Sequence, residues 1–210
     1  MHIFVALHIF MDIQKNIMME EDSMRTQSLG VENLTPEQYE VLADCENIWR
    51  HNVFWSLMTL QQRLFSLPNT PVSEKEVMDL AKQYASLFRR YYGADIAQKM
   101  SGIIEQYCHF YLTYLNEICE KNSGQPCPAE EKWMEAADEI AKELEKLNDF
   151  WREREWRAMI THQIEILSSE AQSTAAGVYG KMPFNYDVLD NICTEMSNYM
   201  AIGLIRKFGI

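Results

Sequence analysis

The long distances between chain-breaking residues most constrain how this chain can fold. Its 210 residues include only 8 glycines and 6 prolines, and most of these fall in a few short stretches. Glycine and proline are the strongest local turn signals, so their clustering indicates long elements joined by few loops. Between the clusters, apolar residues recur at three- and four-residue steps, and no run alternates between apolar and polar as a strand would. The sequence therefore predicts an all-α protein.

Capping signals and loop residues divide the chain into six helices in total. Thr35 and Gln38 form a capping-box pattern at the start of the first helix, and Ser73 and Glu76 form a second one. Gly93 is expected to end the second helix. The predicted helices cover residues 35–66, 73–90, 94–121, 129–147, 150–176 and 186–208. We expect the four longest to form an up-and-down four-helix bundle core, with the two additional helices packed outside it or connecting its ends.

The first thirty residues stand apart from this helical pattern. The apolar run MHIFVALHIFM is too short to span a bilayer, and it lacks the preceding lysine or arginine of a secretory signal. We expect residues 1–30 to be a leader outside the core and residues 31–210 to form a single helical-bundle domain. Two segments in that domain, WRHNVFWSLMTL and WRAMITHQIEIL, both begin with Trp-Arg and suggest a weak internal duplication.

Charge and cysteine content exclude several classes of function. The formal net charge is -12, and because an acidic protein repels phosphate backbones, no nucleic-acid partner is expected. The 5 cysteines include no close CxxC pair, which is typical of buried thiols in a reducing compartment and favours a cytoplasmic protein without a membrane span. The 13 methionines favour an adaptable surface, for a protein partner or for a second copy in a homo-oligomer.

Helical periodicity aims one polar side chain from each of the four long helices at the bundle axis. Each lies on a stripe of apolar residues spaced three and four apart, which is the face that a bundle helix buries. Amide and phenol groups can satisfy a carboxylate by hydrogen bonding without a metal. The sequence therefore predicts a buried polar cluster made of Asn52, Tyr107, Gln163 and Glu195.

A metal site built from histidines is the alternative interpretation. His162 and Glu165 have the reverse order of the Glu-x-x-His pattern found in metal-binding bundles, and Glu105 and His109 share one helix face. Together with His51 they would hold a divalent transition metal, in a metal-binding bundle or a metal-dependent enzyme. A transition metal prefers imidazole or several carboxylates, whereas the predicted inner cluster offers one carboxylate and two amides. We therefore favour no cofactor.

Sequence motifs of catalysis are absent from the chain. It has no phosphate-binding glycine loop, no dinucleotide-binding glycine motif and no nucleophile elbow. We therefore expect a soluble helical bundle with a non-enzymatic role in binding or interaction. A third interpretation is a small-molecule site whose aromatic walls are Trp55, Tyr107, Tyr111 and Tyr199.

The stretch KWMEAADEIAKELEKLNDFWREREWRAM resembles a conserved block of a family of small all-helical bacterial proteins, chiefly from Firmicutes. Some members carry the label acetylglutamate kinase, which no residue here supports. The resemblance, with IWRHNVFWS and EMSNYMAIGLIRKF, spans about residues 40–208. It implies that three family histidines correspond in register to Asn52, Tyr107 and Gln163, while Glu195 is kept. If those histidines bind a metal, as in DinB-like three-histidine bundles, this chain has replaced the ligands with a polar cluster.

Overall fold

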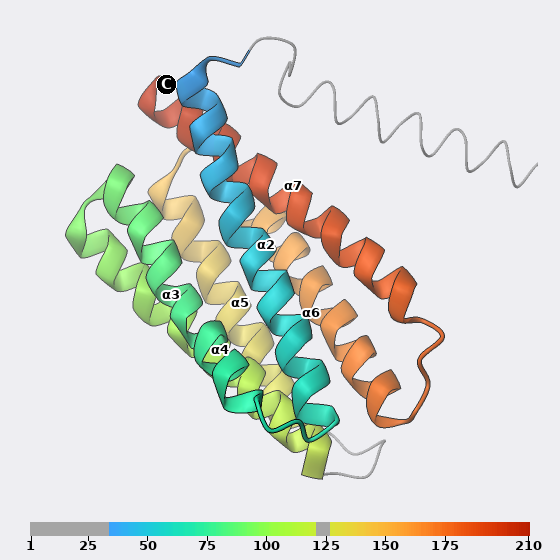
Figure 1. Cartoon of the computed structure of the whole chain (residues 1–210). Helices are drawn as coiled ribbons and strands as arrows, with labels where there is room; N and C mark the ends of the chain where they lie inside the picture. The colour runs from blue at the N-terminus through green and yellow to red at the C-terminus, as the bar shows by residue number, and fades with distance from the viewer. Residues whose placement is uncertain (1–33, 121–126) are drawn as a thin grey trace, which may run out of the picture. The chain divides into compact units, whose positions relative to one another are not determined.

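The structure of the chain, a computed structural model, describes residues 34–120 and 127–210. Within these ranges every regular element is an α-helix (Figure 1), so the predicted all-α class with six helices is confirmed. The predicted leader, residues 1–30, lies outside the described residues. The helices are α2 (Pro36–Leu64), α3 (Thr70–Tyr92), α4 (Ala94–Glu120), α5 (Pro128–Leu147), α6 (Glu153–Ala175) and α7 (Met182–Phe208).

Local capping contacts explain where the first helices begin and end. The predicted capping box is confirmed, because the Thr35 amide donates to Gln38 Oε1 at 3.1 Å and the Gln38 amide donates to Thr35 Oγ1 at 3.2 Å. The second predicted box is wrong, since α3 begins at Thr70 and Ser73 lies inside its first turn. There the Ser73 hydroxyl donates to the Thr70 carbonyl at 2.9 Å. Gly93, with a φ of 83°, ends α3 as predicted.

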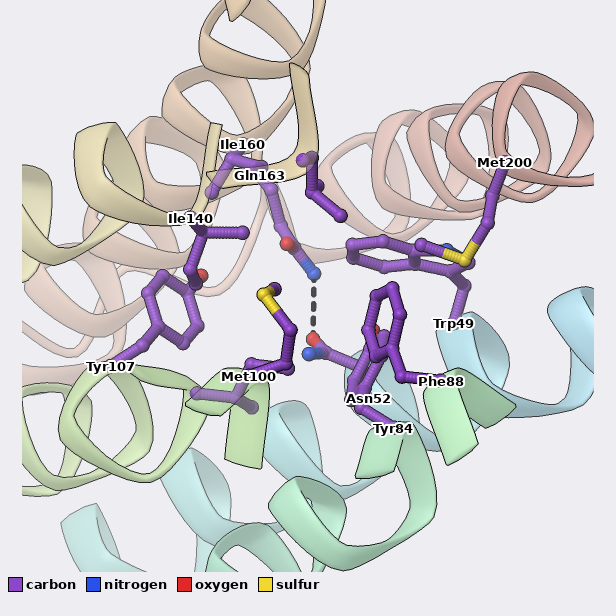
Figure 2. Close-up of a pocket in the computed structure, with 12 residues that line it drawn as sticks. Trp49, Asn52, Tyr84, Phe88, Met100, Tyr107, Ile140, Ile160, Gln163 and Met200 are labelled. Atoms are coloured by element: carbon purple, nitrogen blue, oxygen red, sulfur yellow. Dashed lines mark hydrogen bonds between the residues drawn. The ribbon is translucent and has the colours of Figure 1, made fainter. Parts of the chain in front are cut away.

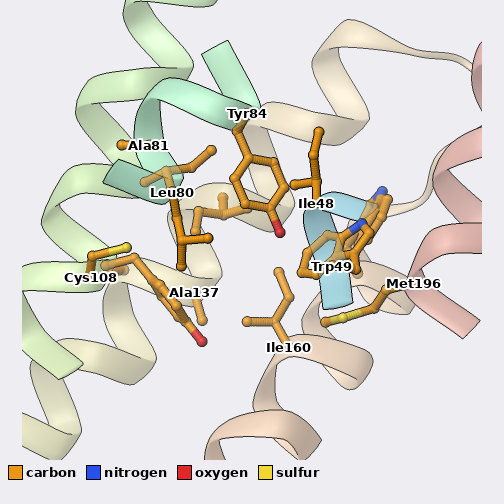
Figure 3. Packing of buried hydrophobic residues seen from close by; sticks show 14 of the residues in the cluster. Ile48, Trp49, Leu80, Ala81, Tyr84, Cys108, Ala137, Ile160 and Met196 are labelled. Carbon is orange, nitrogen blue, oxygen red and sulfur yellow. The ribbon is translucent and has the colours of Figure 1, made fainter. Parts of the chain in front are cut away.

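Residues 40–210 form one compact unit that contains most of α2 and all of α3 to α7. From α3 onward, each helix packs against the next one along the chain and runs in the opposite direction (Figure 1). The two additional helices, α3 and α5, contribute buried side chains to the same core as the longer helices. Figure 3 shows side chains from all six helices meeting there: Trp49, Leu80, Tyr84, Cys108, Ala137, Ile160 and Met196.

Three tryptophans connect α2, α6 and α7 within this unit. Trp49 of α2 stacks on Trp156 of α6 with ring centroids 5.8 Å apart, and Trp156 meets Trp151 edge-on at 5.9 Å. Trp151 is fully buried just before α6, and its indole Nε1 donates to the Tyr199 carbonyl of α7 at 3.1 Å. Aromatic pairs of this kind contribute ~0.5–1.5 kcal/mol each beyond their buried area. The three rings therefore hold α2, α6 and α7 in register.

Gly203 is the point at which Trp151 comes closest to the backbone of α7. A Cβ atom on Gly203 would lie 1.9 Å from Trp151 Nε1 and 2.5 Å from its Cδ1. The indole cannot simply move aside, because it is buried and hydrogen-bonded. Only glycine fits at this position while Trp151 keeps its place.

Cys45, Cys108 and Cys193 are buried, whereas Cys119 is exposed and Cys127 is partly buried, so the prediction of buried thiols holds for three of the five cysteines. Burial raises the pKa of Cys108 to about 12 and the pKa of Cys193 to about 11, so both thiols stay protonated at neutral pH. This agrees with the predicted role of these residues as small buried groups, while the cytoplasmic location stays a prediction. None of the described helices is long and apolar enough to cross a membrane.

Replacing Gly203 with alanine is expected to lower the free energy of unfolding by about 1–3 kcal/mol, because α7 or the Trp151 ring must shift to admit the methyl group. Urea unfolding followed by circular dichroism measures the change. The matched control is Gly102→Ala in α4, where an added Cβ meets nothing within 4 Å. That substitution should raise the free energy of unfolding by about 0.5–1 kcal/mol, because alanine favours a helix. Equal effects of the two substitutions would show that the contact with Trp151 is unimportant.

Candidate functional site

A small cavity lies at the centre of the 40–210 unit (Figure 2). Its volume, taken as the space open to the centre of a water-sized sphere, is about 20 Å³. One water molecule needs about 10–15 Å³ on that measure, so the cavity has room for one or two waters and not for an organic substrate. The lining residues are Trp49, Asn52, Tyr84, Phe88, Met100, Ile104, Tyr107, Ile140, Leu144, Ile160, Gln163 and Met200.

Two buried amides form the polar centre of this cavity. Gln163 Nε2 of α6 donates to Asn52 Oδ1 of α2 at 2.9 Å, and Figure 2 shows the pair surrounded by apolar and aromatic side chains. Gln163 Oε1 is buried and has no hydrogen-bond partner among the described residues. A water in the cavity would satisfy this oxygen, since a buried acceptor left unpaired costs about 1–3 kcal/mol. The structure thus brings together two of the four predicted cluster residues.

The tyrosines beside the amides are neutral groups. Burial raises the pKa of Tyr84 well above its ordinary value, and the neighbouring Asn52 side chain offsets part of that rise. Burial likewise raises the pKa of Tyr107, whose ring lies 5.7 Å from that of Trp133. Tyr107 is buried as predicted and lines the cavity, but its side chain is not part of the hydrogen bond between the two amides (Figure 2). Amides and neutral phenols can bind water, but they supply no general base near neutral pH.

Glu195 is not part of this centre, and its predicted inward orientation is wrong. The residue is exposed, whereas its neighbour Met196 is fully buried. The buried stripe of α7 runs through Leu189, Ile192, Met196 and Met200, so the core-facing position is residue 196 rather than the predicted 195. One residue rotates a helical side chain by about 100°, which is enough to turn Glu195 toward solvent.

The residues of the alternative metal site do not converge. His51 belongs to α2, and its Nδ1 lies 3.0 Å from Gln83 Oε1 of α3. In residues 34–120 and 127–210, no group of three or more His, Cys, Asp or Glu side chains is placed to hold a metal ion. All five predicted ligands are exposed on the outer faces of their helices: His51, Glu105, His109, His162 and Glu165.

The four predicted aromatic wall residues do not enclose one site either. Only Tyr107 lines the central cavity. Tyr111 packs on Trp133 with ring centroids 4.9 Å apart, and its hydroxyl donates to the Ser56 carbonyl at 2.6 Å. Trp55 and Tyr199 are only partly buried, at other places in the unit. Tyr111 and Tyr199 pack against rings of other helices, whereas Trp55 packs against Phe54 of its own helix.

A second candidate site is a groove on the surface between α2 and α7, with a volume of about 470 Å³. Two polar contacts bridge the helices along it. Arg50 pairs with Asp190 at 2.8 Å, and Gln61 Nε2 lies 3.4 Å from the Tyr186 hydroxyl. On α2 these bridges are separated by about 16 Å of helix. The groove is lined by Arg50, Val53, Phe54, Leu57, Met58, Gln61, Tyr186, Asp190 and Cys193.

A buried carboxylate lies behind one end of this groove. Glu170 of α6 is only 1% exposed. It accepts hydrogen bonds from Asn185 Nδ2 at 2.8 Å, Thr174 Oγ1 at 3.2 Å and Gln61 Nε2 at 3.5 Å. These donors are all neutral, and no ion pair to Glu170 occurs in the part of the chain that the structure describes. The carboxylate therefore has hydrogen-bond partners but no compensating cation.

Sequence reasoning missed Glu170 and the groove. Glu170 could have been found, because it lies seven residues after Gln163 and therefore on the same face of α6, two turns along. No sequence signal separates the groove residues Phe54, Leu57 and Met58 from ordinary core residues. Their exposure depends on how far α7 lies from α2, which is a property of the folded unit.

No protein-family model, curated protein or solved structure matches this chain. The resemblance to the helical Firmicutes family therefore stays a prediction, as does the correspondence of Asn52, Tyr107 and Gln163 to family histidines. What the chain does must be argued from its own cavity and groove.

The amide pair yields a test by a double-mutant cycle. Asn52→Leu and Gln163→Met should each lower the free energy of unfolding by about 1–3 kcal/mol, because each leaves a buried amide without its partner. The double variant should lose clearly less than the sum, since it removes both polar groups. Urea unfolding of the four proteins measures the coupling. Simple additivity would contradict the paired arrangement.

The exposed position of Glu195 supplies the matched control for this cycle. Glu195→Ala should change the free energy of unfolding by no more than about 0.5 kcal/mol, as is usual for surface positions. A decrease in the free energy of unfolding as large as that of the amide variants would show that Glu195 belongs to the buried cluster.

Proposed function

We propose that this protein is a non-enzymatic binding module that receives an amphipathic helix of a protein partner in the groove between α2 and α7. The observation that carries the proposal is the apolar stretch of α2 open to solvent in this groove. Phe54 is 50% exposed, and Val53, Leu57 and Met58 are only partly buried. Large side chains of this kind, gathered in a concave surface, are typical of interaction sites.

The shape of the groove favours a helical ligand. Its α2 residues occur at positions 50, 53, 54, 57, 58 and 61, so they form a continuous strip along one helix face. A cleft between two helices, lined by such a strip, is the usual receptor for the apolar face of a third helix. Met58 adds a flexible side chain that can adapt to the shape of a ligand.

The interior supports binding at the surface rather than catalysis inside. The central cavity holds about 20 Å³ and is lined by amides, neutral phenols and apolar side chains. No carboxylate, thiol or imidazole is among its lining residues. A buried polar pair of this kind is suited to fixing the relative positions of α2 and α6.

The charge around the groove favours a basic partner over a second copy of this chain. Arg50, Asp190 and Glu46 all act electrostatically on the Cys193 thiol in the groove wall, so two acids face one base there. Arg50 is already paired with Asp190, and Asp187 is exposed one residue after Tyr186. With a net charge of -12, two copies that meet at this face would bring like charges together. A helix with basic flanks complements the groove instead.

Selection from a displayed library of helical peptides tests the proposal on the full chain. We expect enriched peptides to share apolar residues at three- and four-residue spacing. Phe54→Asp should weaken their binding by at least about tenfold, because it places a charge in the centre of the apolar strip. The matched control is Val72→Asp, at an apolar residue of α3 that is 62% exposed and not among the groove residues. This variant should bind as the parent does.

Two outcomes would overturn the proposal. One is the failure of any peptide to bind in a way that depends on Phe54. The other is self-association of the parent chain, measured by sedimentation and abolished by Phe54→Asp. That result would assign the groove to a second copy of the chain.

A further inference from the structure

Glu170 differs from the other buried carboxyl of the described residues, Glu143, because Glu143 is paired with Lys99 and Lys146. All three hydrogen-bond donors to Glu170, on Gln61, Thr174 and Asn185, are neutral. Taking a carboxylate out of water is costly, and neutral donors recover only part of that cost. A cation brought next to Glu170 would therefore be held strongly, since little solvent remains to screen the attraction.

The groove gives such a cation a route to Glu170. Gln61 and Tyr186 both line the groove, and the Gln61 amide lies 3.5 Å from Glu170 Oε1 and 3.4 Å from the Tyr186 hydroxyl. Both of these contacts are long for hydrogen bonds, so the amide holds its place weakly. Gln61 itself is only partly buried. A rotation of this one side chain would open the groove floor toward the carboxylate.

We infer that this end of the groove is a cation subsite, in which a lysine or arginine of the partner helix pairs with Glu170. The inference rests on the proposed function and names the chemistry of the partner. The Tyr186 hydroxyl and the displaced Gln61 side-chain oxygen would accept the remaining N–H groups of the cation. Negative charge at Glu46 and Asp187 would favour the approach of a basic helix along the same face.

The positions on α2 predict where the basic residue falls in the partner. Phe54 and Gln61 are seven residues apart, which places the apolar strip and the subsite about 10 Å apart along the groove. A helical ligand that runs along the groove matches this distance with two turns of its own. The partner should therefore carry a lysine or arginine about seven residues from its main apolar anchor.

The peptides selected on the parent chain provide the probe. We expect a lysine or arginine to be enriched about two turns from the apolar anchor. Replacing it with norleucine, which keeps the four-carbon chain of lysine but lacks the charged group, should weaken binding to the parent by at least about tenfold. Binding to Glu170→Gln should be weaker from the start and should change little on that replacement. Thermal unfolding checks that Glu170→Gln is folded, and the norleucine peptide tests the parent chain without any variant.

The possible results separate this inference from the proposed function. Peptides that depend on Phe54 but show no basic preference, or whose norleucine analogue binds the parent equally well, would overturn the cation subsite and leave the groove as a binding site. Replacing the lysine could also weaken binding to the parent and to Glu170→Gln by the same factor. That result would place the cation away from Glu170 and would also overturn the subsite. Absence of any Phe54-dependent peptide would overturn both.

Discussion

The packing of three tryptophan rings against one another and against Gly203 sets the relative positions of α2, α6 and α7. Both candidate sites depend on these positions. Trp151 lies against Gly203 of α7, meets Trp156 of α6, and through it reaches Trp49 of α2. Rigid, buried rings transmit position from one helix to the next because close-packed interiors leave them little freedom. The distance between α2 and α7, and with it the width of the surface groove, follows from this row of contacts.

The same helix, α2, serves two environments on its two faces. One face carries Trp49 and Asn52 into the sealed interior, where the amide contact with Gln163 fixes α2 against α6. The other face leaves Phe54 and Leu57 beside the open groove. An exposed apolar strip beside a groove is typical of an interaction site, which makes this face of α2 the one open to a partner.

The features that could be predicted from the sequence are the ones determined locally. Thr35 and Gln38 mark a helix start because their contacts span only one turn. Periodicity also places Asn52 and Gln163 on buried faces, because α2 and α6 carry bulky apolar residues on one side. It failed on α7, where small buried residues such as Ser197 and Gly203 face the core while larger apolar residues lie on several sides. The groove depends on tertiary spacing, which no local pattern encodes.

The topology has a consequence for the order in which the molecule assembles. Helices α3 to α7 pair with their chain neighbours, which requires only short loops to close. Helix α2 contacts its neighbour α3, but its contacts with α6 and α7 reach much farther, with 111 residues between Asn52 and Gln163 and 140 between Arg50 and Asp190. Docking of α2 against α6 and α7 therefore carries the largest entropy cost of chain closure and is expected to come late in folding. Because the groove exists only once α2 has docked, a partner that recognises the groove would bind fully folded molecules and would not bind incompletely folded ones.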